Sequence, residues 1–237
     1  MTSSDKNLVA LVTGGSSGLG RELVLSLAAR GWTVVTDGRR ADRLAELADP
    51  GIVTVPGDLT DADHRTALRA ELTGLGRLDL LVHNAGTLGP SPLPRLETIT
   101  PDQLQQTWRP NVGAPLVLTG ELLDLLVASR GTVVAITSDA AVEHYPGWGL
   151  YGASKAALEH LVLTYAAENP ELTAYAVDPG DLRTEMHQAA FPGADISDRP
   201  LPETVVPHLL ALVDARPPSG RYRAADVSLP EPAGGAR

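Results

Sequence analysis

A glycine-rich run directly after a short apolar segment constrains the fold of this chain more than any other feature. The apolar segment covers 8–12, and the run Thr13-Gly-Gly-Ser-Ser-Gly-Leu-Gly20 follows it. A buried strand that turns through glycines into a helix brings bare backbone close to the phosphates of a dinucleotide, and the N–H groups at the helix start bind them. Gly14, Gly18 and Gly20 would make the sharp turn and keep side chains away from the phosphates. The same run also fits an ordinary strand-to-helix turn, so motifs elsewhere in the chain are needed to distinguish this from a dinucleotide-binding turn.

Apolar segments of strand length recur along the chain, with helical patterns between most of them. Strands are predicted at 8–12, 33–36, 52–55, 78–83, 131–137 and 173–177, with a short seventh near 221–227. Helices are predicted at 19–29, 62–72, 104–127 with a proline interruption, and 152–168. Strands that alternate with helices pair in parallel, because each crossover needs a dozen or more residues to return. We therefore expect an α/β fold, a Rossmann-like, doubly wound, mainly parallel sheet of about seven strands with helices on both faces.

Length and composition exclude several classes of protein. The 237 residues suit one domain over 1–237, with flexible ends at about 1–6 and 228–237. A net charge of −10 without a basic cluster argues against nucleic acid or an anionic membrane as partner. The absence of cysteine excludes disulfides and thiolate catalysis, and the six histidines lack the paired spacing of metal ligands. No segment fits a signal peptide or a membrane span, so we expect a cytoplasmic protein.

Further motifs follow the later apolar segments in a fixed order. They are Asp58, Asn84-Ala-Gly86, Asn111, Ser138, Tyr151-Gly-Ala-Ser-Lys155 and Asp178-Pro-Gly180. Together with a glycine spacing of G-x-x-x-G-x-G instead of G-x-G-x-x-G, they resemble the short-chain dehydrogenase/reductase family in its single-domain form, over about 6–227. The resemblance implies NAD(P)-dependent hydride transfer and names no substrate.

The resemblance also implies which residues bind the cofactor, since ligands of such sheets lie at the carboxyl ends of the strands. The predicted set is Gly14, Ser16, Ser17, Gly18, Leu19, Gly20, Arg39, Arg40, Asp58, Leu59, Asn84, Ala85, Gly86, Tyr151, Lys155, Pro179, Gly180 and Thr184. In the family the aspartate meets the adenine, the Asn-Ala-Gly turn borders the riboses, and the threonine fixes the carboxamide. Taken singly, Asp58 and the 84–86 turn also fit ordinary turn formers.

The segment Thr36-Asp-Gly-Arg-Arg40 bears on the choice between NADP(H) and NAD(H). An acidic side chain after the second strand binds the ribose hydroxyls and repels a 2′-phosphate, whereas arginine binds that phosphate. By the family's spacing Gly38 occupies the usual acidic position, and Asp37 falls one place early and is turned away. Arg39 and Arg40 therefore favour NADP(H), although the glycine loop carries serines where many NADP-dependent relatives have a basic residue. NAD(H) is the alternative cofactor, and a solvated helix start is the alternative role of the two arginines.

Four residues form the predicted catalytic group. Tyr151 and Lys155 are four apart in a helical segment, so they share a face, and the ammonium should lower the pKa of the phenol toward the working range. Tyr151 is then the general acid or base. Among nineteen basic residues only Lys6 and Lys155 are lysines, which suggests that position 155 needs a compact ammonium. The resemblance adds Ser138, whose hydroxyl would bond the substrate oxygen, and Asn111, which would hold a water that passes protons toward Lys155.

Simpler roles stay open for single residues of this group: Ser138 also fits a strand-end turn, and Asn111 a helix kink beside Pro110. The stretch 181–202 has no strong period and fits a loop or broken helix that covers a site. Aromatic and other side chains near it and before Tyr151 are candidates for the substrate pocket, although packing would explain them equally well. They are His144, Tyr145, Trp148, Met186, His187 and Phe191.

The sequence thus predicts an NADP(H)-preferring oxidoreductase that moves hydride between the nicotinamide and a small-molecule carbonyl compound or secondary alcohol. Epimerases and dehydratases of the related families need a longer chain. The alternative from another class is a dinucleotide-binding sensor or regulatory protein without turnover. The resemblance further implies a homodimer or homotetramer built through the helices around Asn111 and Tyr151.

Overall fold

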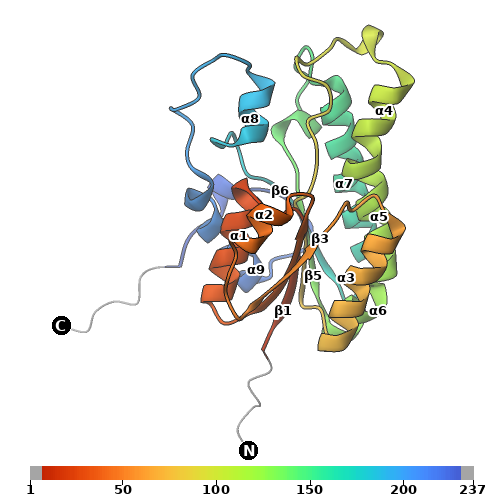
Figure 1. Cartoon of the computed structure of the whole chain (residues 1–237), viewed down its shortest axis with the longest axis vertical. Helices are drawn as coiled ribbons and strands as arrows, with labels where there is room; N and C mark the ends of the chain where they lie inside the picture. The colour runs from red at the N-terminus through yellow and green to blue at the C-terminus, as the bar shows by residue number, and fades with distance from the viewer. Residues whose placement is uncertain (1–6, 231–237) are drawn as a thin grey trace, which may run out of the picture.

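Seven parallel strands form one sheet in the computed structural model, which describes residues 7–230 (Figure 1). The strands are β1 (Val9–Val12), β2 (Thr33–Gly38), β3 (Ile52–Pro56), β4 (Leu80–His83), β5 (Thr132–Ile136), β6 (Thr173–Asp178) and β7 (Gly220–Arg223). Their order across the sheet is β3-β2-β1-β4-β5-β6-β7, and each neighbouring pair is parallel. The predicted fold class is confirmed. The seventh strand is shorter than expected, because the chain turns into a 3-10 helix over Ala224–Asp226.

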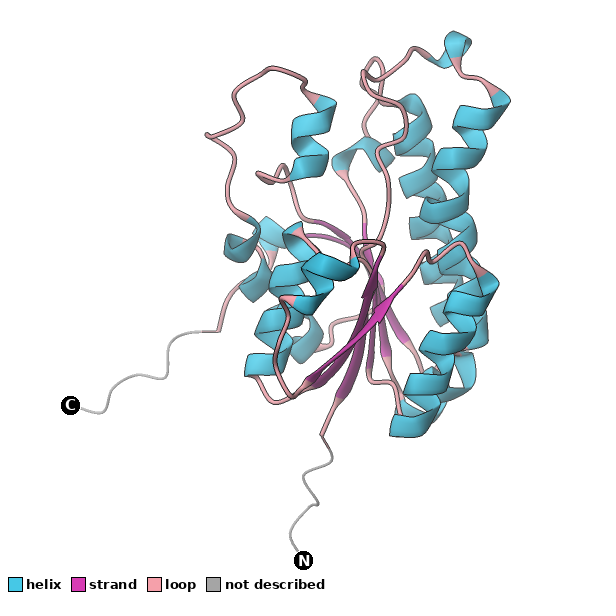
Figure 2. Cartoon of the chain, viewed as in Figure 1, coloured by secondary structure: helices cyan, strands magenta, loops and turns pink. Residues whose placement is uncertain are grey.

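Helices connect the strands and cover both faces of the sheet (Figure 2). They are α1 (Gly18–Ala29), α2 (Ala41–Ala45), α3 (Ala62–Leu75), α4 (Pro101–Trp108), α5 (Ala114–Glu121), α6 (Leu123–Ser129), α7 (Gly149–Glu168), α8 (Glu185–Ala190) and α9 (Val206–Ala215). The helix expected over 104–127 is therefore three helices. A π-helix over Arg109–Gly113 separates the first two, because Pro110 has no N–H to continue the regular ladder, and a second break falls at Leu122.

The apolar core lies in two layers, one on each face of the sheet. Strand residues alternate between them: Ala10 and Val12 pack with α1 and α9, whereas Val9 and Leu11 pack with α3, α5, α6 and α7. Burial on both faces explains why the strands are continuous apolar runs without polar alternation. Within residues 7–230 no single helix is long and apolar enough to cross a membrane. In the described part of the chain, one bent helix pair, Pro101–Glu121 and Leu123–Ser129, meets that test jointly, and its apolar face contributes to the second core layer.

The strand order places a crevice at one end of the sheet. From β1 the chain first builds outward to β2 and β3, and then crosses back to add β4 on the other side of β1. The crossovers diverge at this point, so the carboxyl ends of β1 and β4 border an open space, which is where ligands of such sheets bind. Helix α8 lies above this end in Figure 1. The ends predicted to be flexible, 1–6 and 228–237, lie outside the described residues except for 228–230.

Candidate active site

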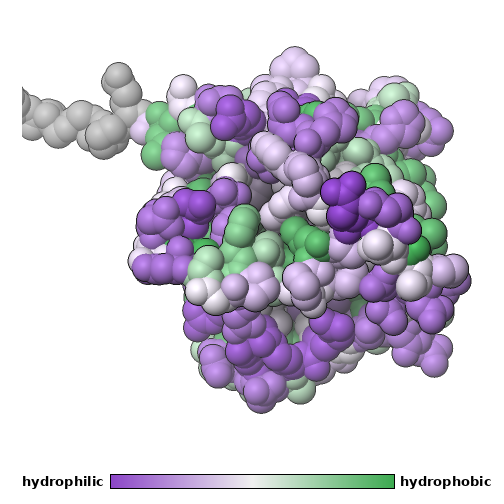
Figure 3. Space-filling view, turned by 90° about the horizontal axis from the view of Figure 1, so that it is seen from above, coloured by the Kyte–Doolittle hydropathy of each residue, from purple (hydrophilic) through white to green (hydrophobic). Residues whose placement is uncertain are grey.

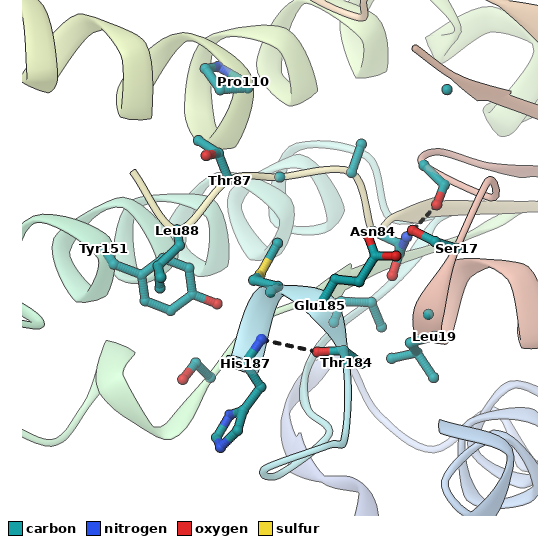
Figure 4. Close-up of a pocket in the computed structure, with 18 of the residues that line it drawn as sticks. Ser17, Leu19, Asn84, Thr87, Leu88, Pro110, Tyr151, Thr184, Glu185 and His187 are labelled. Carbon is teal, nitrogen blue, oxygen red and sulfur yellow. Dashed lines mark hydrogen bonds between the residues drawn. The ribbon is translucent and has the colours of Figure 1, made fainter. Parts of the chain in front are cut away.

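A groove of about 1720 Å³ runs across the carboxyl ends of the strands. Figure 3 looks down on this end of the molecule, where apolar side chains gather near the middle within a polar surround. All predicted site residues line the groove except Gly20 and Asn111, which lie just behind it. Residues from segments far apart in the sequence, among them Ser17, Asn84, Tyr151 and Thr184, face the same space in Figure 4.

The glycine-rich turn needs its glycines for both backbone angle and space. Gly14 and Gly18 have φ angles of +72° and +55°, a region that side chains disfavour. A Cβ atom on Gly20 would lie 2.5 Å from the carbonyl oxygen of Gly14, so the helix could not start so close to the strand. Asn84 fastens the turn from the end of β4, because its Nδ2 donates to the carbonyls of Thr13 (2.8 Å) and Gly14 (3.2 Å).

The first turn of α1 presents backbone donors to the groove. Its N-cap residue, Ser17, makes no side-chain capping hydrogen bond, and the first turn carries no acidic residue. Helix starts leave N–H groups without partners, and the helix dipole adds positive potential there. Ser16, Ser17, Gly18 and Leu19 all line the groove at this point. A dinucleotide pyrophosphate fits this arrangement of donors.

The segment after β2 separates its acidic and basic side chains. Asp37 is 2% exposed and is turned inward, as its position one place early suggested. Arg39 is exposed and lines the groove. Arg40 lines it too, but its guanidinium binds Glu185 at the start of α8 (3.0 Å), and Arg43 binds the other oxygen of the same carboxylate (2.6 Å). Neither Arg43 nor Glu185 was foreseen, since 142 residues separate them in the chain.

Two predicted cofactor residues follow β3. Asp58 accepts hydrogen bonds from the backbone N–H and the hydroxyl of Thr60 (2.9 and 2.8 Å). Burial raises the pKa of Asp58, but these hydrogen bonds and the nearby Arg39 outweigh it and hold the pKa below its usual value. Leu59 is only 6% exposed and packs chiefly in the core layer of α3, so it lies at the margin of the groove.

Tyr151 and Lys155 lie together on the groove side of α7. The Lys155 ammonium is 5.6 Å from the centre of the Tyr151 ring and donates to the carbonyl of Ile136 (2.8 Å). Burial lowers the pKa of Lys155 to about 8, and Glu159 offsets this in part. Gly86 forms the opposite wall, where a Cβ atom would lie 3.6 Å from Lys155 Nζ and 3.1 Å from Asn111 Oδ1. Glycine therefore leaves the space in front of the amine open.

The expected lowering of the Tyr151 pKa is wrong for this structure. Burial raises the pKa of Tyr151 well above its usual range, and the carboxylates of Asp139 and Asp178 raise it further. The ring is 7% exposed, so the loss of water around a phenolate outweighs the lysine beside it. The Tyr151 hydroxyl is consequently protonated at neutral pH.

Ser138 and Asn111 are both held by their neighbours. Ser138 Oγ donates to Asp139 (2.9 Å) and accepts from the N–H of Ala140 (3.1 Å), at the point where β5 opens into the groove. Asn111, 1% exposed in the π-helix, joins Thr87 to Ser154 through its amide group. Only its backbone and the second lone pair of Oδ1 remain for a water. A π-helical turn inside a longer helix is typical of a functional position.

The predicted covering segment 181–202, expected to be a loop or a broken helix, contains the short helix α8 between loops. Thr184 caps α8 by accepting from the N–H of His187 (3.1 Å), so its hydroxyl is engaged in the helix start. The turn before it, Pro179–Gly180, borders the groove, and the φ of Gly180 is +75°. At the other end of α8, the Ser91 hydroxyl donates to the carbonyl of Ala189 (2.7 Å).

Aromatic side chains border the groove next to Tyr151. Trp148 contacts Tyr151 edge to face (5.7 Å between ring centres) and Phe191 at a tilted angle (6.1 Å). The ring centres of His187 and Phe191 are 5.0 Å apart. Tyr145 also lines this part, and its hydroxyl donates to Asp139 (3.0 Å). The candidate substrate pocket is thus apolar and flat-sided, with acidic groups at its margin.

Arg221 is a site residue that sequence patterns missed. From β7 it reaches behind the catalytic group, where it donates to the carbonyl of Ser138 (3.1 Å), to Glu159 (3.1 Å) and to Asp178 (3.4 Å). Arg221 therefore partly neutralises Asp178, one of the two carboxylates that raise the pKa of Tyr151. Nothing near Arg221 in the sequence signals this role. In residues 7–230 no cluster of three or more His, Asp or Glu side chains is arranged to hold a metal ion.

Comparison with known proteins agrees with this geometry. The sequence profile of the family described as short chain dehydrogenase matches residues 8–195. The oxidoreductase YciK of Escherichia coli K12, whose function is uncharacterized, is 33% identical over 227 residues, covering 90% of this chain and 89% of its own. The 11-beta-hydroxysteroid dehydrogenase A of Sesamum indicum is 33% identical over 192 residues, which are 77% of this chain but 55% of that protein.

A solved structure of similar fold contains a bound cofactor. A short-chain dehydrogenase of Shigella flexneri 2a strain 301, crystallised with NADP, superposes with a TM-score of 0.85 at 31% identity, covering 92% of this chain and 97% of its own. Both the profile match and these identities extend over most of the sheet and the groove. This protein is an oxidoreductase of the short-chain dehydrogenase/reductase family.

Proposed function

We propose that this protein is an NADP(H)-preferring reductase of carbonyl compounds, acting in reverse on secondary alcohols, with Tyr151 as the general acid and base. The observation that carries the proposal is the position of Tyr151, Lys155 and Ser138 at one end of a groove whose other end carries the exposed Arg39. A nicotinamide cofactor supplies the hydride when bound there. The chain's own residues bind it, orient the substrate and supply the proton.

The proton donor is Tyr151. Its raised pKa keeps the hydroxyl protonated at neutral pH, which suits donation to the alkoxide that forms when a carbonyl is reduced. The Lys155 ammonium, 5.6 Å from the ring centre, favours the phenolate that remains. Ser138 orients the substrate oxygen beside Tyr151.

The arginines support the preference for NADP(H), with NAD(H) as the alternative. A 2′-phosphate binds well to arginine, and Arg39 lines the groove with an exposed guanidinium. The structure of the Shigella relative with NADP supports the same preference. Arg39→Ala should weaken NADPH binding by about ten- to a hundredfold and NADH binding little, whereas equal losses would contradict the assignment.

The substrate pocket supports neutral carbonyl compounds over acidic ones. Trp148 and Phe191 offer apolar surface, while Asp139 and Asp181 lie at the margin and would repel an anion. Oxidation of NADPH with a panel of ketones, aldehydes, quinones and keto acids tests this. Turnover of the neutral compounds supports the proposal. Binding of NADPH without turnover of any member would favour the sensor.

We further propose that the protein acts as a homodimer or homotetramer. Exposed apolar side chains gather on α4 and α5, namely Leu104, Trp108, Leu116 and Val117. A single-chain mass in sedimentation at micromolar concentration would contradict this.

A further inference from the structure

Two hydrogen bonds hold the carboxylate of Asp37, at the end of β2, in a buried position at the edge of the groove. One carboxylate oxygen accepts from the N–H of Gly14 (2.8 Å), and the other accepts from Nε2 of His64 in the first turn of α3 (3.0 Å). Both side chains are buried, at 2% and 8% exposure. The acidic residue is thus bound to the glycine turn on one side and to α3 on the other.

His64 lies in a space that the backbone leaves for it. A Cβ atom on Gly57, the residue after β3, would lie 2.1 Å from His64 Nδ1 and 2.6 Å from its Cγ. Only glycine at this position lets the imidazole pack flat against the chain. The ring consequently has a defined position, with Nε2 directed at Asp37.

The position of Asp37 links its hydrogen bond with His64 to the choice between NADPH and NADH. Asp37 still lines the groove, two residues before Arg39 in the chain. A carboxylate turned into the groove here would accept hydrogen bonds from ribose hydroxyls and repel a 2′-phosphate. The second acidic group nearby, Asp58, is already bound by Thr60.

We propose that His64 is a specificity-determining positioning residue: by holding Asp37 against the glycine turn, it keeps a carboxylate away from the cofactor's 2′ group. This rests on the proposed preference for NADP(H). Without His64, a buried carboxylate with one partner is unfavourable, and it turns toward the groove and its water. The preference then moves from NADPH toward NADH.

The test measures dissociation constants of NADPH and NADH by fluorescence titration. His64→Leu should change the ratio of the two dissociation constants by about tenfold or more in favour of NADH. The released Asp37 carboxylate would repel the 2′-phosphate of NADPH and accept hydrogen bonds from the ribose hydroxyls of NADH. His64→Gln keeps an N–H donor and should retain the wild-type ratio. So should His160→Leu, an exposed control on α7. The double variant His64→Leu with Asp37→Asn should regain the ratio, because an amide carries no charge.

Equal weakening of both cofactors in His64→Leu, or no recovery in the double variant, would overturn the proposal. Asp37→Asn alone keeps both contacts when its Oδ1 accepts from Gly14 and its Nδ2 donates to Nε2 of His64 in the other ring tautomer, and it tests the proposal independently of whether His64→Leu folds. An unchanged ratio in Asp37→Asn supports the proposal, while a gain for NADPH would mean that the carboxylate already acts on the cofactor and would overturn it. A wild-type protein that prefers NADH contradicts the proposed function, whereas the shift caused by His64→Leu is measured separately.

Discussion

Replacing Lys155 with methionine should abolish catalysis and yet relieve a cost in the stability of the cofactor-free protein. Lys155 is 3% exposed, and burial lowers its pKa from 10.5 to about 8. A lysine whose pKa falls on folding destabilises the folded state at every pH at which the amine of the unfolded chain is protonated. A residue that the proposed reaction needs is therefore retained at the expense of stability.

The magnitude follows from the two pKa values. The change from 10.5 to about 8 corresponds to about 3 kcal/mol at pH 7. Between these pKa values the unfolded chain binds more protons than the folded one, so stability rises with pH, and about 2 kcal/mol is recovered by pH 9.5. Methionine also loses the hydrogen bond to Ile136, a cost of about 1–3 kcal/mol that does not depend on pH.

Urea denaturation at pH 7 and pH 9.5 separates the two effects. The free energy of unfolding of Lys155→Met minus that of the wild type should fall by about 2 kcal/mol from pH 7 to pH 9.5. Arg95→Met removes a cation that is 76% exposed and should give a difference that is constant with pH. A constant difference for Lys155→Met as well would refute the reasoning, because it would mean that protonation of the buried amine does not lower the free energy of unfolding.

Three further predictions concern proton transfer and the cofactor groove. Tyr151→Phe should lower kcat by about 10²–10⁴-fold with NADPH affinity nearly unchanged in fluorescence titration, and a near wild-type rate would remove Tyr151 from the mechanism. Glu185→Gln frees Arg40 and Arg43, so NADPH should bind about two- to fivefold more tightly, given the modest strength of exposed ion pairs, while the affinity for NADH should stay at the wild-type value. Arg221→Met leaves Asp178 uncompensated and should raise the pKa of Tyr151 further, so the pH at which alcohol oxidation reaches half its maximal rate should move upward. An unmoved pH profile would leave Arg221 a purely structural role.

The parts of the structure that sequence patterns predicted are those set by local rules. The strands are continuous apolar runs because both faces of the sheet are covered, and the glycine turn follows from backbone angles that only glycine adopts readily. Tyr151 and Lys155 face the same way because of helical spacing alone. Each of these depends on residues within a few positions of one another.

The parts that were missed depend on contacts between distant segments. His64 looks like any polar residue at a helix start until β2 and β3 bring Asp37 and Gly57 against it. The Tyr151 pKa was expected to fall because the lysine was visible in the sequence, whereas the burial that dominates it was not. The bounds of helix α8 within the predicted loop or broken helix could not be given, because its six residues are too few to show a period.

The placement of the site at the switch point of the sheet links binding to stability. The groove is assembled from the ends of β1, β2, β3, β4, β5 and β6, so it is not complete before the centre of the sheet has formed. A cofactor therefore binds only the folded chain, and at a hundred times its dissociation constant it adds about 2.7 kcal/mol to the free energy of unfolding. The same relation gives any stabilising ligand a thermal shift, so compounds can be ranked by melting temperature before a substrate is known.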